Sequence, residues 1–128
     1  MNNKMRIVGI VGALAVGIGA FGAHGLKPFL DANQTEIFKT ATLYHFVHVI
    51  PMLMLALWSR ESKLTSLSFY LFLIGICCFS GSLYILSTKH LYGADAWNFV
   101  GPVTPLGGLF FIAGWLNLLR IKDLKDVN

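Results

Sequence analysis

Four long stretches of this 128-residue chain contain no Asp, Glu, Lys or Arg: Ile7–Leu26, Thr40–Ser59, Leu64–Thr88 and Ala96–Leu119. Each stretch has between 20 and 25 residues. An α-helix rises about 1.5 Å per residue, so each could cross a hydrocarbon core of roughly 30 Å. The ten basic and six acidic residues all lie in the connections and tails. The sequence therefore predicts an all-α fold, an integral membrane four-helix bundle that forms a single domain over residues 1–128.

The composition supports this class and excludes others. Hydrophobic residues make up 55% of the chain and charged residues 12%, whereas a soluble domain has about 25% charged residues. The net charge of +4 comes from basic residues that flank the apolar stretches, where they would meet lipid headgroups. We therefore expect the lipid bilayer as the main partner, and no nucleic acid. The first stretch is longer than the h-region of a signal peptide, about 7–15 residues, so we expect it to be retained.

The distribution of cations predicts the orientation. With four spans, both ends of the chain lie on the same side of the membrane. Seven cations then fall on that side and three on the other. The first set is Lys4, Arg6, Arg60, Lys63, Arg120, Lys122 and Lys125; the second is Lys27, Lys39 and Lys89. The positive-inside rule accordingly places both termini in the cytoplasm, in a multi-pass protein of the inner membrane.

Small residues recur at spacing four in the first span, a pattern that lets helices approach closely in lipid. One row is Gly9, Ala13 and Gly17; the other is Ala15, Gly19 and Ala23. We interpret both rows as packing surfaces within the monomer. The pattern leaves open a homo-oligomer or a membrane-protein partner.

The starts of the second and fourth spans carry helix-boundary signals. Asn33 followed by Glu36 resembles a capping box and predicts that the second helix begins near Gln34. Residues 101–108 contain two prolines and three glycines, which predicts a broken start to the fourth span. Thr104 would cap the helix and Pro105 would be its first residue.

Uncharged polar residues gather toward the predicted outer face. They are His24, Tyr44, His45, His48, Ser80, Ser82, Tyr84 and Thr104. Because Tyr44 and His45 lie four and three residues before His48, all three share a helix face, and His48 would be the centre of the group. We expect His48 to point toward His24 and toward Ser80 and Tyr84. These side chains would also bond the backbone groups freed before Thr104.

Two interpretations of this polar group stay open: hydrogen bonds that hold the helices together, or a small pocket for a headgroup, a metal, a haem or a proton. His24 and His48 could in principle ligate a haem or a metal, but the spacing defines no metal site. No catalytic constellation or nucleotide-binding loop is visible, so we predict no enzymatic activity and no cofactor. A small transporter or channel-like subunit is the alternative, although a polar path through the inner half is missing.

Several motifs resemble those of one family. These are Gly19-Ala20-Phe21-Gly22-Ala23-His24, Tyr44-His45-Phe46-Val47-His48, Phe79-Ser80-Gly81-Ser82-Leu83-Tyr84, Val103-Thr104-Pro105-Leu106-Gly107-Gly108 and Ala113-Gly114-Trp115. In this order they resemble the YgdD/YwdK-type small bacterial membrane proteins, a family that is similar to the eukaryotic transmembrane protein 256. The resemblance covers nearly the whole chain. It implies a four-span inner-membrane protein and no particular activity, because the family is a domain of unknown function.

Overall fold

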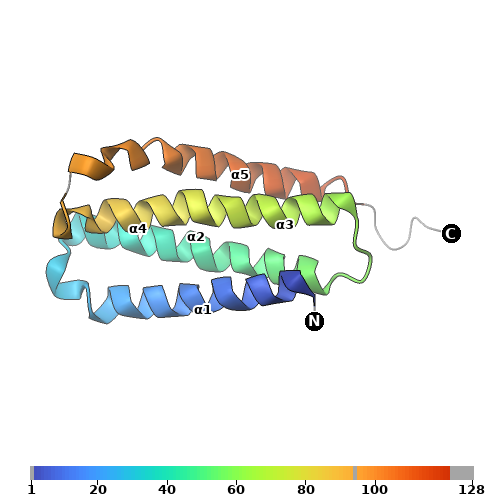
Figure 1. Cartoon of the computed structure of the whole chain (residues 1–128), viewed down its shortest axis with the longest axis horizontal. Helices are drawn as coiled ribbons and strands as arrows, with labels where there is room; N and C mark the ends of the chain where they lie inside the picture. Colours follow the sequence, from blue (N-terminus) through green and yellow to red (C-terminus); the bar gives the residue numbers. More distant parts are fainter. Residues whose placement is uncertain (1, 94, 122–128) are drawn as a thin grey trace.

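The chain folds into a bundle of long helices, shown in Figure 1. The structure, a computed structural model, describes residues 2–93 and 95–121, and of residues 95–97 it describes the backbone alone. The α-helices are α1 (Asn3–His24), α2 (Ala32–Leu57), α3 (Lys63–Gly75), α4 (Gly81–Thr88) and α5 (Val103–Leu118). A π-helical segment, η2 (Ile76–Ser80), joins α3 to α4. Three 3₁₀ segments occupy the connections: η1 (Lys27–Phe29), η3 (Lys89–Leu91) and η4 (Asp95–Val100).

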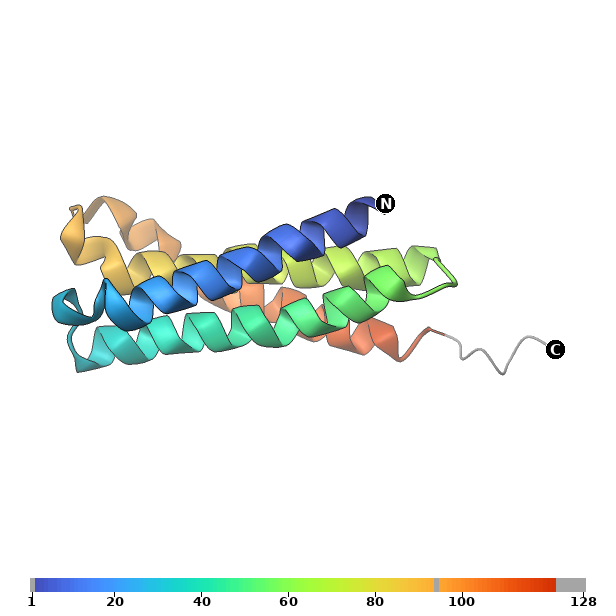
Figure 2. The same ribbon diagram turned by 90° about the horizontal axis from the view of Figure 1, so that it is seen from below.

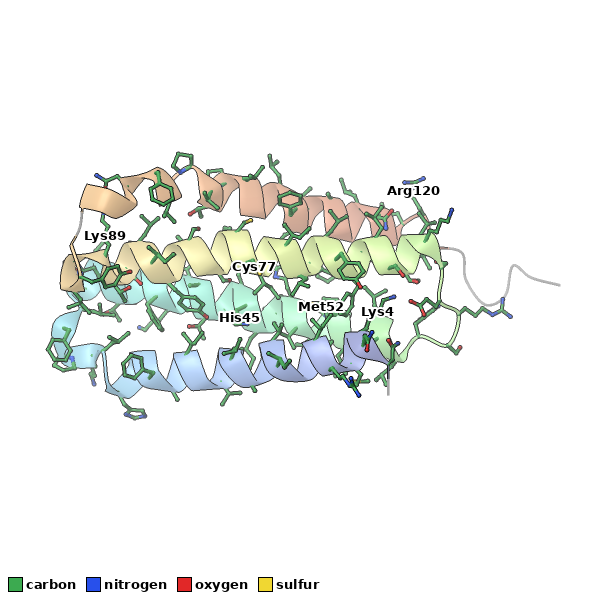
Figure 3. All side chains as sticks on the ribbon, viewed as in Figure 1. Lys4, His45, Met52, Cys77, Lys89 and Arg120 are labelled. Atoms are coloured by element: carbon green, nitrogen blue, oxygen red, sulfur yellow. The ribbon has the colours of Figure 1, made fainter. Side chains whose placement is uncertain are left out.

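Four of the described helical stretches are long and apolar enough to cross a membrane: Asn3–His24, Ala32–Leu57, Lys63–Leu91 and Asn98–Leu118. The predicted all-α architecture is thus found, and these four stretches correspond to the four predicted spans. The first residue of α1 and the last residue of α5 lie at the same end of the bundle (Figure 1). Lys4 and Arg120 mark that end, and Lys89 marks the opposite end (Figure 3). Two predicted cations of the first end, Lys122 and Lys125, lie outside the described residues.

The helices are not packed in a closed square. α2 packs against α1 on one side and against α3, η2 and α4 on another, while α5 packs along α3 and η2. In the described residues α2 and α5 lack close backbone packing with each other. Figure 2, seen from below, shows α1 and α2 crossing over the other helices. Ile50 of α2 and Ile112 of α5 line the space between these helices and are 60% and 56% exposed, so no other described helix covers this face of the bundle.

The second helix begins earlier than the charge pattern predicted. Its N-cap is Asp31, whose side chain accepts a hydrogen bond from the Gln34 amide while the Gln34 side chain returns one to Asp31. The predicted capping pair of Asn33 and Glu36 was therefore wrong by two residues. The early start places Glu36 and Lys39 on the helix surface, where their ion pair is exposed.

One face of α1 packs on α2. Ala15 is fully buried, and a Cβ added at Gly19 would lie 3.1 Å from the Thr42 methyl group. Ala15 and Gly19 of this predicted row therefore lie on the face toward α2, whereas Ala23 is exposed.

The row of Gly9, Ala13 and Gly17 points away from the bundle, so the prediction that it packs within the monomer was wrong. All three residues are exposed, and a Cβ at Gly9 or Gly17 would meet nothing within 4 Å. At 100° per residue, this row lies about 140° around the helix from the face that contacts α2. Spacing alone does not say which of two small-residue faces meets a neighbour.

The core and the outer surface are both apolar, as a bilayer requires. Val8, Met52, Phe69, Phe72 and Phe111 are buried in one cluster that joins α1, α2, α3 and α5. Large aliphatic side chains face outward on every long helix, for example Ile10 at 62% and Leu109 at 62% exposure. Such a surface would be unstable in water and is favourable against acyl chains.

A buried lysine clamps the first helix to the connection between α2 and α3. The Lys4 ammonium lies 2.6 Å from Glu61 Oε1 and 2.7 Å from Ser66 Oγ, and 5.7 Å from the centre of the Phe69 ring. The Lys4 side chain is 7% exposed and the Glu61 side chain 62% exposed. The hydrogen bond and the charge of Lys4 hold the pKa of the Glu61 carboxyl below its ordinary value of 4.5.

This clamp predicts a pH dependence. Because the pKa of Glu61 is lower in the folded state, its contribution to stability is complete above the ordinary pKa of 4.5 and is lost as the pH falls through the folded pKa. Thermal unfolding in detergent, measured from pH 7 to pH 3, should therefore show a fall in Tm at acid pH that Glu61→Gln reduces. Glu36→Gln is the control, since that carboxylate pairs with an exposed lysine at the other end of the bundle, whereas Lys4 is buried. Equal acid sensitivity of the wild type and Glu61→Gln would contradict the clamp.

The fourth span has the predicted broken start, but its details differ. η4 is a 3₁₀ segment, residues 101–102 form a turn, and α5 begins at Val103 with Pro102 as its N-cap. Thr104 is therefore inside the helix and does not cap it. The freed backbone groups are bonded locally, from the Gly101 amide to the Asn98 carbonyl and from the Thr104 amide to the Gly101 carbonyl. The predicted bonding of this backbone by the polar cluster was wrong.

Candidate functional site

The predicted polar cluster divides into three separate groups. His48 belongs to the first, His45 with Tyr84 to the second, and Ser82 with Thr104 to the third. His24 belongs to none of them and is exposed. The predicted single cluster was therefore wrong, because these residues occupy different helix faces and His48 lies level with the middle of α1, far from His24.

His48 is buried and fully hydrogen-bonded. Its Nδ1 lies 2.7 Å from the Tyr44 carbonyl oxygen, which can only accept, so Nδ1 carries the proton. Its Nε2 accepts a hydrogen bond of 3.1 Å from the Trp115 indole. The ring stacks on Phe111 with 3.6 Å between ring centres and an interplanar angle of 7°. These contacts hold a neutral imidazole between α2 and α5.

His45 is held in the same way on another face of α2. Its Nε2 lies 3.1 Å from the Val11 carbonyl oxygen and must donate to it, while its Nδ1 accepts from the Tyr84 hydroxyl at 3.0 Å. This single side chain links α1, α2 and α4. Figure 3 shows His45, which belongs to α2, about halfway along the bundle on the side toward α1. The interpretation of these polar groups as interhelical hydrogen bonds fits this geometry.

A shared metal or haem site for His24 and His48 does not fit this arrangement. Val49 packs on Gly12, so the neighbouring His48 lies level with the middle of α1. His24 is twelve residues further along α1, which is about 18 Å at 1.5 Å per residue. Both ring nitrogens of His48 are already bonded. Within residues 2–93 and 95–121, no group of three or more His, Cys, Asp or Glu side chains could hold a metal ion.

Two neighbouring serines on the third span have opposite environments. The Ser82 hydroxyl donates to the Phe79 carbonyl at 2.9 Å and contacts the Thr104 hydroxyl of α5. Because the Ser82 proton is used, Thr104 donates to Ser82. Ser80 is fully buried, and its hydroxyl has no hydrogen-bond partner within the described residues.

This contrast predicts opposite effects of the same substitution. Ser82→Ala should lower the free energy of unfolding by about 1–2 kcal/mol, because it leaves the Thr104 hydroxyl unpaired. Ser80→Ala should be neutral or stabilising, since it removes an unpaired buried hydroxyl. Unfolding titrations of both variants in SDS–detergent mixtures would measure the difference. A larger loss for Ser80→Ala than for Ser82→Ala would mean that Ser80 has a partner.

A groove runs along the uncovered face between α2 and α5, and we call it the α2–α5 groove. Its outer part has a volume of about 500 Å³ and is lined by residues that include Tyr44, His48, Gly108 and Phe111. Its inner part has a volume of about 370 Å³ and is lined by residues that include Met54, Trp58, Thr65, Leu118 and Ile121. Val47 and Trp115 line both parts, so the two parts adjoin. The lining is almost entirely apolar and aromatic, with the His48–Trp115 hydrogen bond where the parts meet.

The sequence reasoning missed this groove and its central partner. Trp115 and Phe111, which hold His48, were not assigned to the site. Trp115 was named only as part of a family motif, because the site was predicted from the positions of polar residues near the outer face. With α2 starting at Ala32, His48 is assigned a deeper position, which is the depth of Trp115 on α5.

Comparison with known proteins identifies the family. The model of a protein family of unknown function, DUF423, matches residues 18–108. The chain belongs to the DUF423 family, whose curated members are named UPF0382 membrane proteins. This confirms the resemblance found from the motifs, and it confirms a multi-pass membrane protein of a family with unknown activity.

The relatives cover nearly the whole chain. A UPF0382 membrane protein of Haemophilus influenzae is 39% identical over 92% of this chain and 92% of its own length. The YwdK protein of Bacillus subtilis is 38% identical over 90% of this chain and 94% of its own length. A relative in Schizosaccharomyces pombe is 32% identical over 89% of this chain and 96% of its own length. No solved structure matches the chain.

Proposed function

We propose that this DUF423 protein is a non-enzymatic inner-membrane protein that binds the acyl chain of a membrane lipid in its α2–α5 groove. The observation that carries the proposal is the groove itself. It joins two cavities of about 500 and 370 Å³, a size typical of ligand sites, and it opens on the face that meets the bilayer. An apolar cleft at membrane depth is complementary to a hydrocarbon chain.

The structure of the groove floor supports a preformed site. The stack of His48 on Phe111 and the bond from Trp115 fix the aromatic side chains between α2 and α5. Rigid walls reduce the entropy that is lost on binding. Because His48 has no free nitrogen, the floor offers shape and apolar area to a ligand, not a ligating or acid–base group.

The alternative of a small transporter has weaker support. The inner half is less apolar than the sequence suggested, because Lys4, Thr65, Ser68 and Asn117 are buried there. These groups bond locally: the Asn117 amide donates to the Leu64 carbonyl and to Ser68, and Ser68 donates to the Gly114 carbonyl. Such bonds stabilise the contact between α3 and α5 and do not connect to His45 or His48.

The proposal includes an orientation with both termini in the cytoplasm. The clustering of Lys4, Arg60, Lys63 and Arg120 at one end supports it. Single cysteines at Asn2 and at Asn33, in a Cys77→Ala/Cys78→Ala background, would be treated with an impermeant thiol reagent in intact spheroplasts. We expect Asn33→Cys to react and Asn2→Cys to be protected. The reverse pattern would overturn the orientation.

The groove is tested with Trp115 as a reporter. In a Trp58→Phe/Trp97→Phe variant Trp115 is the remaining tryptophan, since the chain has three. A phospholipid with brominated acyl chains, titrated into the detergent-solubilised protein, should quench its fluorescence in a saturable way. Unbrominated lipid should reverse the quenching by competition.

Val47→Phe tests whether the lipid occupies the groove, because Val47 lines both of its parts. We expect this variant to weaken binding about tenfold or more, which corresponds to about 1.4 kcal/mol. Val16→Phe is the matched control, since Val16 is 60% exposed on α1, away from the groove. Quenching that never saturates, or that is the same in both variants, would overturn the proposal.

A further inference from the structure

We infer that the lipid bound in the α2–α5 groove is an anionic phospholipid of the leaflet at the end of Lys4 and Arg120, with its headgroup held by Arg60, Lys63 and Arg120. This inference rests on the proposed function, because the acyl chain must occupy the inner part of the groove for the headgroup to reach these cations. It adds the chemical class of the lipid and the residues that select it.

The cations lie at the mouth of the groove. Trp58 and Thr65 line the inner part, and Arg60 and Lys63 lie two residues from them in the connection from α2 to α3. On the other wall, Arg120 lies between the lining residues Leu118 and Ile121. All three cations are exposed. The apolar groove therefore ends at a group of positive charges, and its inner end carries Trp58, an aromatic residue suited to the headgroup region.

The acidic residue of this mouth is already neutralised. Among the described residues Glu61 is the acidic side chain at this end, and it lies between Arg60 and Lys63 in the sequence. Its carboxylate is paired with the Lys4 ammonium at 2.6 Å, on the side of α1. Within residues 2–93 and 95–121, Arg60, Lys63 and Arg120 have no ion-pair partner, and a phosphate with net negative charge is the group that they would attract.

Arg6 is the control residue that distinguishes a headgroup site at the groove from a general preference of surface cations for anionic lipid. Arg6 is exposed on α1 at the same end of the bundle. However, α1 packs on α2 and has no close packing with α5 in the described residues. Arg6 therefore shares the depth and charge of the groove cations but not their position. A purely positive-inside role would make all these cations equivalent.

The experiment uses the Trp115 reporter with two brominated lipids that have identical acyl chains. One is phosphatidylglycerol, which is anionic, and the other is phosphatidylcholine, which is zwitterionic. We expect phosphatidylglycerol to bind about 25-fold or more tightly than phosphatidylcholine at low salt, and this difference to shrink as salt screens the charges. Arg60→Gln/Arg120→Gln should weaken phosphatidylglycerol binding by about 25-fold, or fivefold per cation, and leave phosphatidylcholine binding unchanged. Arg6→Gln should change neither.

The outcomes distinguish this inference from the proposed function. Saturable binding with equal affinities for the two lipids would overturn the headgroup inference and leave the acyl-chain groove intact. If Arg6→Gln loses as much phosphatidylglycerol affinity as Arg60→Gln/Arg120→Gln, the preference comes from general surface charge, and the headgroup inference is overturned as well. If neither lipid gives saturable quenching, the proposed function itself fails. Circular dichroism of each variant confirms that its helices are retained, and Lys63→Gln replaces Arg60→Gln if that variant does not fold.

Discussion

Replacing His48 with alanine is expected to lower the free energy of unfolding by about 2–4 kcal/mol. The substitution leaves the Trp115 indole without its acceptor, which costs about 1–3 kcal/mol, and removes the stack on Phe111, worth about 0.5–1.5 kcal/mol. Unfolding in SDS–detergent mixtures, followed by circular dichroism, measures the effect. His24→Ala is the matched control and should change the stability little, because His24 is exposed on α1.

A double-mutant cycle separates the hydrogen bond from simple loss of packing. Trp115→Phe keeps an aromatic ring in the groove but removes the indole donor. If the bond exists, His48→Ala should cost less in the Trp115→Phe background than in the wild type, with a coupling energy of about 0.5–3 kcal/mol. Additive effects would show that His48 and Trp115 act independently. Equal losses of stability in His48→Ala and His24→Ala would contradict the placement of His48 at the floor of the groove.

Replacing Gly107 with alanine is expected to destabilise the protein by about 3 kcal/mol, although alanine favours helix. A Cβ at Gly107 would lie 2.3 Å from the Phe79 backbone nitrogen and 2.7 Å from the Phe79 Cα. Both contacts are with backbone, so no side chain can rotate away, and α5 would have to move from the π-helical segment η2. Thermal unfolding in detergent checks the loss.

The neighbouring glycine supplies the control for Gly107. A Cβ at Gly108 would lie 3.9 Å from Phe79 Cδ2, which is an ordinary contact. Gly108→Ala should therefore be neutral or more stable by up to about 1 kcal/mol, as expected from helix propensity. The two substitutions are chemically identical and adjacent on α5. Similar effects would mean that α5 does not pack on the η2 backbone at Gly107.

Some features of the fold follow directly from the sequence, because charge is so costly in hydrocarbon. The uncharged windows gave the four spans, and the prolines and glycines between Gly101 and Gly108 gave the broken start of the fourth. The π-helical turn at Ile76–Ser80 had no visible signal. This turn lies against α5 at Gly107, which is a tertiary contact that the sequence pattern does not contain.

The candidate site could be predicted only in part. The uncharged window predicts that the second span enters the membrane at Thr40, but α2 begins eight residues earlier, at Ala32. His48 was therefore placed near the outer surface, whereas it lies level with the middle of α1. Its true partner, Trp115, lies on α5 at that same depth. The direction of each side chain around its helix depends on which helices are neighbours, and the polar pattern did not contain that information.

The groove gives the two histidines different roles. His45 links α1, α2 and α4 through Val11 and Tyr84, which makes it part of the bundle's internal support. His48 holds aromatic rings at the floor of a site that faces lipid. We expect both to remain neutral while these hydrogen bonds persist, because protonation would place an N–H against the Trp115 donor and would leave the Tyr84 hydroxyl without its acceptor.

The most direct test of the account is native mass spectrometry of the protein purified from its own membrane in mild detergent. We expect one phospholipid to stay bound to the wild type and to Leu116→Phe, which alters a lipid-facing side chain that is 58% exposed. Leu118→Phe, which fills the inner part of the groove, should lose this lipid. A wild type without bound phospholipid, or a Leu118→Phe variant that retains it as fully as Leu116→Phe, would contradict the account.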